Sequence, residues 1–179
     1  MRWHESTWTR IGRMDRGTPV VIPLGSIEQH GPHLPLAVDT IQVEAIADRL
    51  EHRLGDRALF LPTQWLGSSH HHMDFTGTIS LRPSLYGQLV QELARCVLAH
   101  GFTRVLFLNG HGGNEAPATA ALSELVATDD RADRACIAFS SWWKAGRDAL
   151  APERHGMTTP SISHACEYET SLLMALRPE

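Results

Sequence analysis

Residues 20–39 read VVIPLGSIEQHGPHLPLAVD, and this stretch decides the fold that we expect for the whole chain. Its first five residues form a short apolar run rich in valine and isoleucine, which is typical of a buried strand. Gly25 ends the run, and the prolines and glycine that follow cannot continue a strand or begin a helix. A helical pattern of apolar residues begins after Asp39. The stretch therefore predicts a strand, a polar loop and a helix in that order.

The loop carries two carboxylates and two imidazoles, on Glu28, His30, His33 and Asp39. Hard and borderline divalent metal ions prefer oxygen and imidazole nitrogen ligands. Glu28 and His30 lie two residues apart, so they project to the same side of an extended backbone. Asp39 has two carboxylate oxygens and can bridge two ions. The alternative is a polar surface loop in which Asp39 caps the following helix.

Further apolar runs and helical patterns alternate along the rest of the chain. Strands are predicted at residues 18–24, 58–62, 104–108 and 135–139, and helices at 4–13, 40–53, 83–100, 115–127 and 164–176. Strands that alternate with helices of this length are typical of parallel βαβ units in a layered α/β domain. Because the chain has no internal repeat and no linker, residues 1–179 are expected to form a single domain.

Each predicted strand is followed by a loop that carries chemically useful side chains. The loops contain EQHGPH with Asp39, HHHMD, NGHGGN and SSWWK. In parallel α/β sheets, ligands bind beyond the carboxyl ends of the strands. The sequence therefore predicts one site at that edge, with the EQH, NGH and SWW loops together.

The NGHGGN loop holds His111 among three glycines, which let the backbone approach an ion or ligand closely. Two alternatives remain: a glycine-rich turn in which His111 only packs, and a phosphate-binding loop before a helix. The loop has no lysine or arginine, which disfavours phosphate.

Two other loops offer candidates that have an equally simple structural explanation. Three adjacent histidines at 70–72 cannot all face one ion, and we expect His72 to reach the site. His70 and His71 would otherwise belong to a solvated loop. Trp142 and Trp143 end a strand, and tryptophans usually pack in a core or interface. Of the two, Trp143 is the better candidate for contact with a substrate.

The segment HACEYETS at 164–171 places His164, Glu167 and Ser171 on one face if it is helical. In that arrangement Glu169 points elsewhere, and the Cys166 thiol lies off the shared face. A histidine and a glutamate at this spacing are typical of ligand pairs on helices. The alternative is the capped start of an amphipathic helix.

Composition limits the kinds of partner. The formal charge of -4 and the pI of about 6.2 give no reason to expect nucleic acid or an anionic membrane. The three cysteines form no disulfide pattern, which suits a reducing compartment. We find no secretory signal and no apolar run near the roughly 20 residues that span a bilayer. A cytoplasmic protein is expected.

Taken together, GSIEQHGPHLPL with VD, FTGTISL, NGHGGN and HACEYETSLLMAL resemble the creatininase family of metal-dependent amidohydrolases. The resemblance implies a three-layer α/β/α fold with a mainly parallel sheet, a homo-hexamer, and two divalent ions. Zinc is the first expectation for these ions, with manganese or iron as alternatives. Relatives continue some tens of residues beyond the position of Glu179, so a C-terminally shortened form is expected.

The resemblance also implies roles for individual residues. The implied metal ligands are Glu28, His30, Asp39 and His111, with Asp39 as the bridge. His164 matches the catalytic histidine, and Trp143 matches a tryptophan that covers the substrate. We also assign His72 and Asn114 to substrate binding.

One departure from the family pattern leads to a further expectation. Creatininase proper has a glutamate two residues after the NGH histidine, where this chain has Gly113. We expect Glu167 to supply the missing oxygen ligand, beside His164 as proton shuttle. The competing assignment is that Glu167 only orients a ligand histidine. The glycine form favours the branch with formamide hydrolases and the mycofactocin peptidase.

The expected function is hydrolysis of a C–N amide bond in a cyclic amide, a formamide or a short peptide, through attack of a metal-bound hydroxide. Two rivals remain. A metal-dependent phosphoesterase would want cationic side chains, and the four loops offer only Lys144. A non-catalytic metal-binding or scaffold protein is the other.

Overall fold

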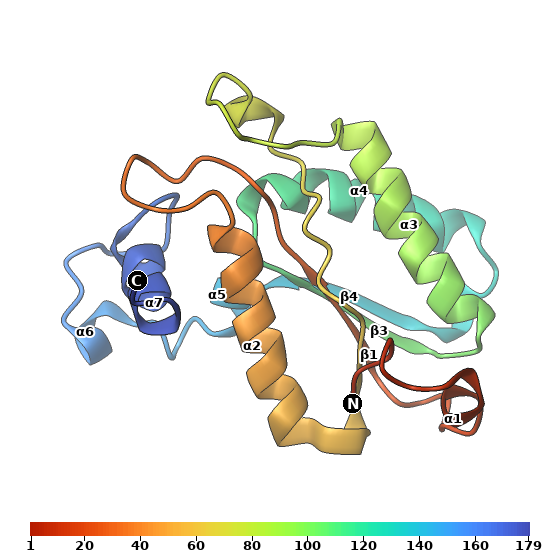
Figure 1. The fold of residues 1–179 in the computed structure, drawn as a ribbon. Helices are drawn as coiled ribbons and strands as arrows, with labels where there is room; N and C mark the ends of the chain where they lie inside the picture. The colour runs from red at the N-terminus through yellow and green to blue at the C-terminus, as the bar shows by residue number, and fades with distance from the viewer.

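The computed structural model describes all residues from 1 to 179. Four parallel strands form one sheet in the order β2-β1-β3-β4 (Figure 1). The strands are β1 (Val20–Leu24), β2 (Leu59–Phe60), β3 (Arg104–Asn109) and β4 (Cys136–Ser141). The predicted parallel α/β sheet is confirmed, and each predicted strand lies within two residues of an observed one.

The three longer strands end together at one edge of the sheet. Leu24 of β1 pairs with Asn109 of β3, which in turn pairs with Ser141 of β4. Because the strands run in the same direction, the loops that follow them all leave from this carboxyl edge. The EQH, NGH and SWW loops therefore share one edge, as predicted.

Seven α-helices accompany the sheet. They are α1 (Trp8–Gly12), α2 (Val38–Leu54), α3 (Pro83–Ala99), α4 (Glu115–Thr128), α5 (Trp142–Ala145), α6 (Pro152–His155) and α7 (Glu167–Leu176). Pro83 begins α3, where its missing N–H costs nothing. The N-terminal helix is shorter than predicted, because the Thr7 side chain caps it by accepting the Arg10 N–H. None of the helices has the length and apolar character needed to cross a membrane.

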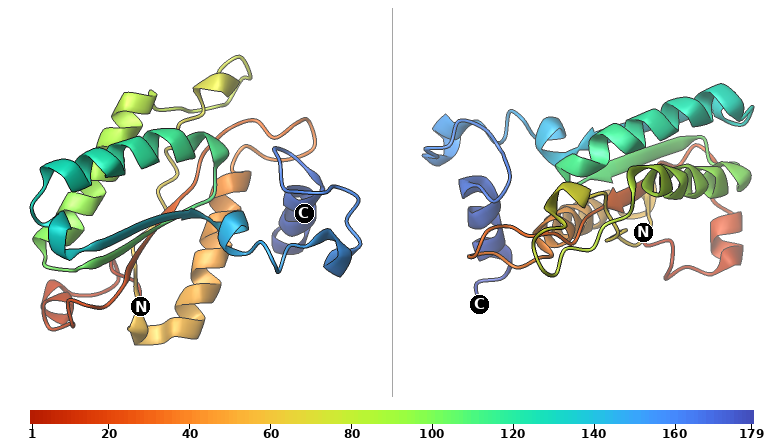
Figure 2. Two further views of the ribbon diagram at one scale, coloured as in Figure 1. Left: turned by 180° about the vertical axis from the view of Figure 1, so that it is seen from behind. Right: turned by 90° about the horizontal axis from the view of Figure 1, so that it is seen from above.

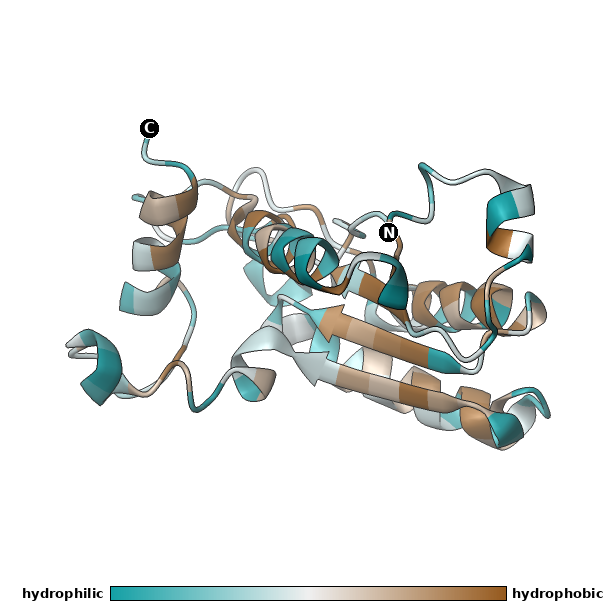
Figure 3. Ribbon diagram, turned by 90° about the horizontal axis from the view of Figure 1, so that it is seen from below, coloured by the Kyte–Doolittle hydropathy of each residue, from teal (hydrophilic) through white to brown (hydrophobic).

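Helices cover both faces of the sheet, and β1 shows why. Val20, Ile22 and Leu24 belong to the core cluster that contains the buried faces of α3 and α4. Val21 belongs to the other cluster, with Val43 of α2. This alternation is the two-residue period of a strand that is buried on both faces. The layers can be followed in Figure 2, and Figure 3 shows the apolar strands between helices of mixed hydropathy.

The last helix begins later than predicted, which changes the geometry of the site. Ala165 has a left-handed backbone with φ of 50°, and Cys166 is extended, so α7 starts at Glu167. His164 therefore lies in a loop rather than on the helix. α7 lies beside α2 (Figure 1), and the Gln42 side chain donates a 2.8 Å hydrogen bond to the Glu169 carbonyl.

Candidate metal centre

Four predicted ligands meet at the carboxyl edge and are almost fully buried. Glu28 and His30 lie in the loop after β1, Asp39 lies in the first turn of α2, and His111 follows β3. Their exposed fractions are 3% or less. Buried carboxylates are stable only when they are paired, hydrogen-bonded or bound to a cation.

His111 is oriented toward the two carboxylates. Its Nδ1 lies 3.2 Å from Glu28 Oε1 and 3.1 Å from Asp39 Oδ2. On the other side of the ring, Nε2 lies 3.2 Å from the Ser68 carbonyl and 3.1 Å from the Ser69 hydroxyl. The Nε2–H can donate to the carbonyl, which leaves Nδ1 to face the carboxylates. Metal-binding histidines are commonly oriented by such a hydrogen bond.

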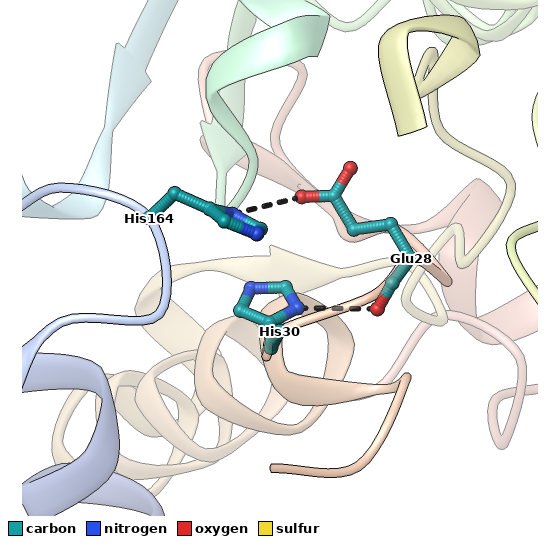
Figure 4. A group of neighbouring side chains, drawn as sticks. All are labelled: Glu28, His30 and His164. Atoms are coloured by element: carbon teal, nitrogen blue, oxygen red, sulfur yellow. Dashed lines mark hydrogen bonds and ion pairs between the residues drawn. The ribbon is translucent and has the colours of Figure 1, made fainter. Parts of the chain in front are cut away.

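His30 is oriented in the same manner from the opposite side of Asp39. Its Nδ1–H donates to the Glu28 backbone carbonyl at 3.2 Å, as Figure 4 shows. Its Nε2 lies 3.3 Å from Asp39 Oδ1 and 3.9 Å from Glu169 Oε2. Asp39 thus turns one oxygen toward His30 and the other toward His111. This is the arrangement required of a bridging carboxylate.

The carboxylate beside His30 belongs to Glu169, and the expectation for Glu167 is wrong in this structure. Glu167 turns away and accepts hydrogen bonds of 2.8 to 3.0 Å from the N–H groups of Thr158 and Thr159 and from the Thr158 hydroxyl. Because His164 is not helical, the expected alignment of residues 164 and 167 does not exist. A helix that starts at Glu167 instead turns Glu169 toward α2.

Gly113, at the departure from creatininase proper, has no room for a side chain. A Cβ atom there would collide with the Ser68 carbonyl oxygen and with His111 Nε2, the two groups whose contact orients His111. A glutamate at this position would therefore require a different loop. Glu169 provides a carboxylate from another element.

Unpartnered atoms indicate that the cluster suits a cation. Seven buried side-chain nitrogen or oxygen atoms have no hydrogen-bond partner, and four of them are Glu28 Oε2, His30 Nε2, Asp39 Oδ2 and Glu169 Oε2. Some of these atoms lie near one another, but not in hydrogen-bonding geometry. Each unsatisfied buried group costs about 1–3 kcal/mol, and more if it is charged. Bound divalent ions would satisfy all four, so the residues fit the predicted metal site.

The same crowding shifts the pKa values of the cluster. Burial favours neutral imidazole, but Asp39 and Glu28 outweigh it and raise the pKa of His111 to about 10. Burial also raises the pKa of Glu169 to about 7, although His30 opposes this change. Without a metal ion, protons on His111 and Glu169 reduce the negative charge of the cluster. Metal binding would displace these protons.

His164 joins the cluster through Glu28, and Gln29 positions it. His164 Nδ1 lies 3.4 Å from Glu28 Oε1 (Figure 4). The Gln29 amide nitrogen lies 2.9 Å from His164 Nε2 and 3.0 Å from His72 Nδ1. The Gly31 N–H donates to the Gln29 amide oxygen, so the amide N–H groups face both rings. Sequence reasoning missed Gln29, although its place between Glu28 and His30 was a signal.

A short 3₁₀ turn spreads the three histidines at 70–72 in different directions. His72 lies within hydrogen-bonding distance of Gln29 and stacks on His164, with ring centroids 4.5 Å apart. His71 lies over His111 instead, with ring centroids 6.0 Å apart. Burial lowers the pKa of His71, and the neighbouring His72 adds to this effect.

Asn114 does not face a substrate, contrary to our expectation. It is fully buried, and its amide oxygen accepts the Ser68 N–H at 2.9 Å. Its amide nitrogen donates to the Gly25 carbonyl and to the Asn109 side chain. These contacts use the hydrogen-bonding groups of its side chain. Asn114 therefore connects the loops that follow β1, β2 and β3 rather than binding a ligand.

A cavity of about 490 Å³ opens over the cluster. Trp143 and Ile162 provide its apolar wall, and His72 and His164 line the polar side. Trp143, the tryptophan that we predicted to contact a substrate, thus borders the cavity above the cluster. Lys144 also borders the cavity, but its ammonium is paired with Glu115 at 2.7 Å.

A parallel α/β sheet with paired carboxylates and imidazoles at its carboxyl edge defines an α/β protein with a candidate site for divalent metal ions. The creatininase family model, described as creatinine amidohydrolase, matches residues 4–179. The chain belongs to the creatininase family.

Individual relatives agree with this assignment. The mycofactocin precursor peptide peptidase of Mycobacterium ulcerans is 34% identical over 97% of this chain and 61% of its own length. The creatinine amidohydrolase of Pseudomonas putida is 31% identical over 98% of this chain and 71% of its own length. A creatininase mutant of Zn-Zn type has a similar structure, with a TM-score of 0.84 and 27% identity, over 99% of this chain and 72% of that one. The chain therefore spans 61% of the peptidase that it matches.

Proposed function

We propose that this chain carries the active site of a hydrolase that uses two divalent ions, with zinc as the first choice, to cleave a C–N amide bond. The observation that carries the proposal is the set of four unpartnered donor atoms buried at the carboxyl edge of the sheet. The kinship to a peptidase and to an amidohydrolase supports amide chemistry. Manganese or iron would suit the same mixture of oxygen and nitrogen donors.

The proposed ligand sets follow the two sides of Asp39. Glu28, Asp39 and His111 would hold one ion, and His30, Asp39 and Glu169 would hold the other. When bound, the ions would act as Lewis acids that polarise the substrate carbonyl and lower the pKa of water. The Ser68 carbonyl and the Glu28 backbone carbonyl keep the two histidine rings in the orientation needed for binding.

His164 is the proposed proton carrier. Its Nε2 accepts from Gln29, so the neutral ring carries its proton on Nδ1, which faces Glu28. Burial lowers the pKa of His164, and His30 lowers it further, which favours the neutral ring. Nε2, which carries no proton in that form, is the nitrogen at which the ring can accept one. A proton held on this ring can then pass to the leaving nitrogen of the amide.

Trp143, Ile162 and His72 would position the substrate in the cavity. An apolar wall opposite a row of polar groups suits a small amide, a formamide or the end of a short peptide. Lys144 is the only lysine or arginine that lines the cavity, and it is paired with Glu115, which disfavours the phosphoesterase alternative. A homo-hexamer is part of the proposal because of the family resemblance, and light scattering of the purified protein tests it.

The deciding experiment combines metal content with turnover. The purified chain is stripped with a chelator, reloaded with zinc or manganese, and assayed against formamides, lactams and short peptides. We expect about two bound ions and turnover that depends on them. A fully loaded protein that cleaves no amide would instead indicate a non-catalytic metal-binding protein.

A further inference from the structure

His71 has surroundings that neither of its neighbours shares. One of its ring nitrogens, a Glu28 carboxylate oxygen and a His111 ring nitrogen all lie within 4.8 Å of one another. The rings of His71 and His111 are nearly parallel, with an angle of 6° between their planes. His71 also lines the cavity above the cluster. Three metal-binding side chains therefore converge from three different loops.

We propose that His71 is an additional protein ligand of the ion that Glu28 and His111 hold. This inference rests on the proposed function, because it adds a donor to one of the two proposed ions. Donors of one zinc ion lie at most about 4.2 Å apart, twice the Zn–N distance. Since His71 is exposed whereas Glu28 and His111 are buried, a small movement of His71 alone brings the three donors to that spacing.

The structure provides room for the His71 ring, and it leaves an oxygen of Glu28 without a hydrogen-bond partner. A Cβ atom at Gly113 would lie 2.9 Å from His71 Cε1, so the missing side chain at 113 leaves the room that the imidazole uses. Glu28 Oε2 is buried and has no hydrogen-bond partner. The ion beside it would gain a neutral nitrogen donor without any further burial of charge.

The loop that carries His71 also contacts His111, on the side of the ring that faces away from the carboxylates. The Ser68 carbonyl and the Ser69 hydroxyl orient His111 through its Nε2. The Ser69 N–H is fastened to the Ser80 side chain at 2.7 Å. The segment from Ser68 to His71 would thus orient one ligand, His111, and supply a second ligand, His71.

The test compares His71→Ala with His70→Ala in the full chain. Both residues are exposed in the same turn, but His70 belongs to no group of metal-binding side chains. The stripped proteins are titrated with zinc against a coloured chelator, and their Co²⁺ forms are recorded by visible absorption spectroscopy. We expect His71→Ala to weaken one of the two zinc equivalents by on the order of 10- to 100-fold and to change the Co²⁺ spectrum. His70→Ala should change neither.

The outcomes separate this inference from the proposed function. Wild-type zinc affinities and an unchanged Co²⁺ spectrum in His71→Ala overturn the His71 assignment alone. If wild-type protein binds no zinc, the proposed function fails as well. His71→Gln keeps most of the side-chain volume without the imidazole nitrogen, so an equal loss of affinity in this variant excludes a packing effect. Circular dichroism of each variant confirms that the fold is intact.

Discussion

The two halves of the candidate centre are built from different parts of the chain. The Glu28–His111 half uses the loops after β1 and β3, which are neighbouring strands with a fixed register. The His30–Glu169 half needs α7, which reaches the centre only by packing beside α2. Asp39 touches both halves. The first half is therefore fixed by the sheet, whereas the second depends on how the C-terminal helix docks.

Loss of the shared residue should have the largest effect. Asp39→Ala removes the only carboxylate that faces both His30 and His111, so we expect both zinc equivalents and the dependent turnover to be lost. Elemental analysis after zinc loading measures this loss. Glu44→Ala, which removes an exposed carboxylate from the same helix, is the matched control. Retention of one tightly bound ion in Asp39→Ala would contradict the bridging role.

Glu169→Gln should affect one half only. We expect it to weaken one zinc equivalent by on the order of 10- to 100-fold or more, and to leave the Glu28–His111 ion in place. Glu167→Gln is the control, because that carboxylate faces Thr158 and Thr159 instead. Zinc titration of the two variants side by side gives the answer. A loss in Glu167→Gln alone would reverse our assignment.

Gln29→Leu tests the residue that holds His164 beside both halves. We expect kcat to fall by roughly tenfold with zinc content unchanged, as for other residues that orient catalytic groups. The Gln29 N–H donates to neutral His164, so its loss should raise the pKa of His164 and move the acidic limb of kcat to higher pH. If kcat falls but the acidic limb stays at the same pH, Gln29 has only a structural role.

The smallest effect concerns stability against pH in the metal-free protein. Because the pKa of His111 is raised to about 10, its contribution is complete below its unfolded pKa of about 6.5 and is lost as pH rises through about 10. We therefore expect the Tm of metal-free protein to fall by a few degrees between pH 7 and 10, after subtraction of the same change in His111→Ala. With zinc bound, the ion replaces the proton and this difference should disappear. An equal fall in metal-free wild type and His111→Ala would contradict it.

The sequence predicted the sheet because its signals there are local and repeated. The apolar runs and the loops at their ends located the carboxyl edge, and with it Glu28, His30, Asp39 and His111 at one place. In a parallel sheet, the loops that follow neighbouring strands must lie together, so the positions of their residues can be predicted from the strands.

The C-terminal contribution could not be predicted in the same manner. Whether Glu167 or Glu169 faces the site depends on where α7 begins, and the left-handed Ala165 that delays the helix has no sequence signal. An alanine is not expected at positive φ. The role of Asn114 was misjudged for another reason. Its motif indicates closeness to the site, but only the three-dimensional structure shows that its amide already forms hydrogen bonds within the protein.

The place of Glu169 in the last helix also has a consequence for the order in which the site is made. Glu28, Asp39 and His111 are all present once the chain has been synthesised through β3 and its loop. Glu169 comes only after β4 and the connection that contains α5 and α6. During synthesis the donors of the first proposed ion are thus complete before those of the second. Metal loading would then have a built-in sequence, with the C-terminal helix closing a centre that already holds one ion.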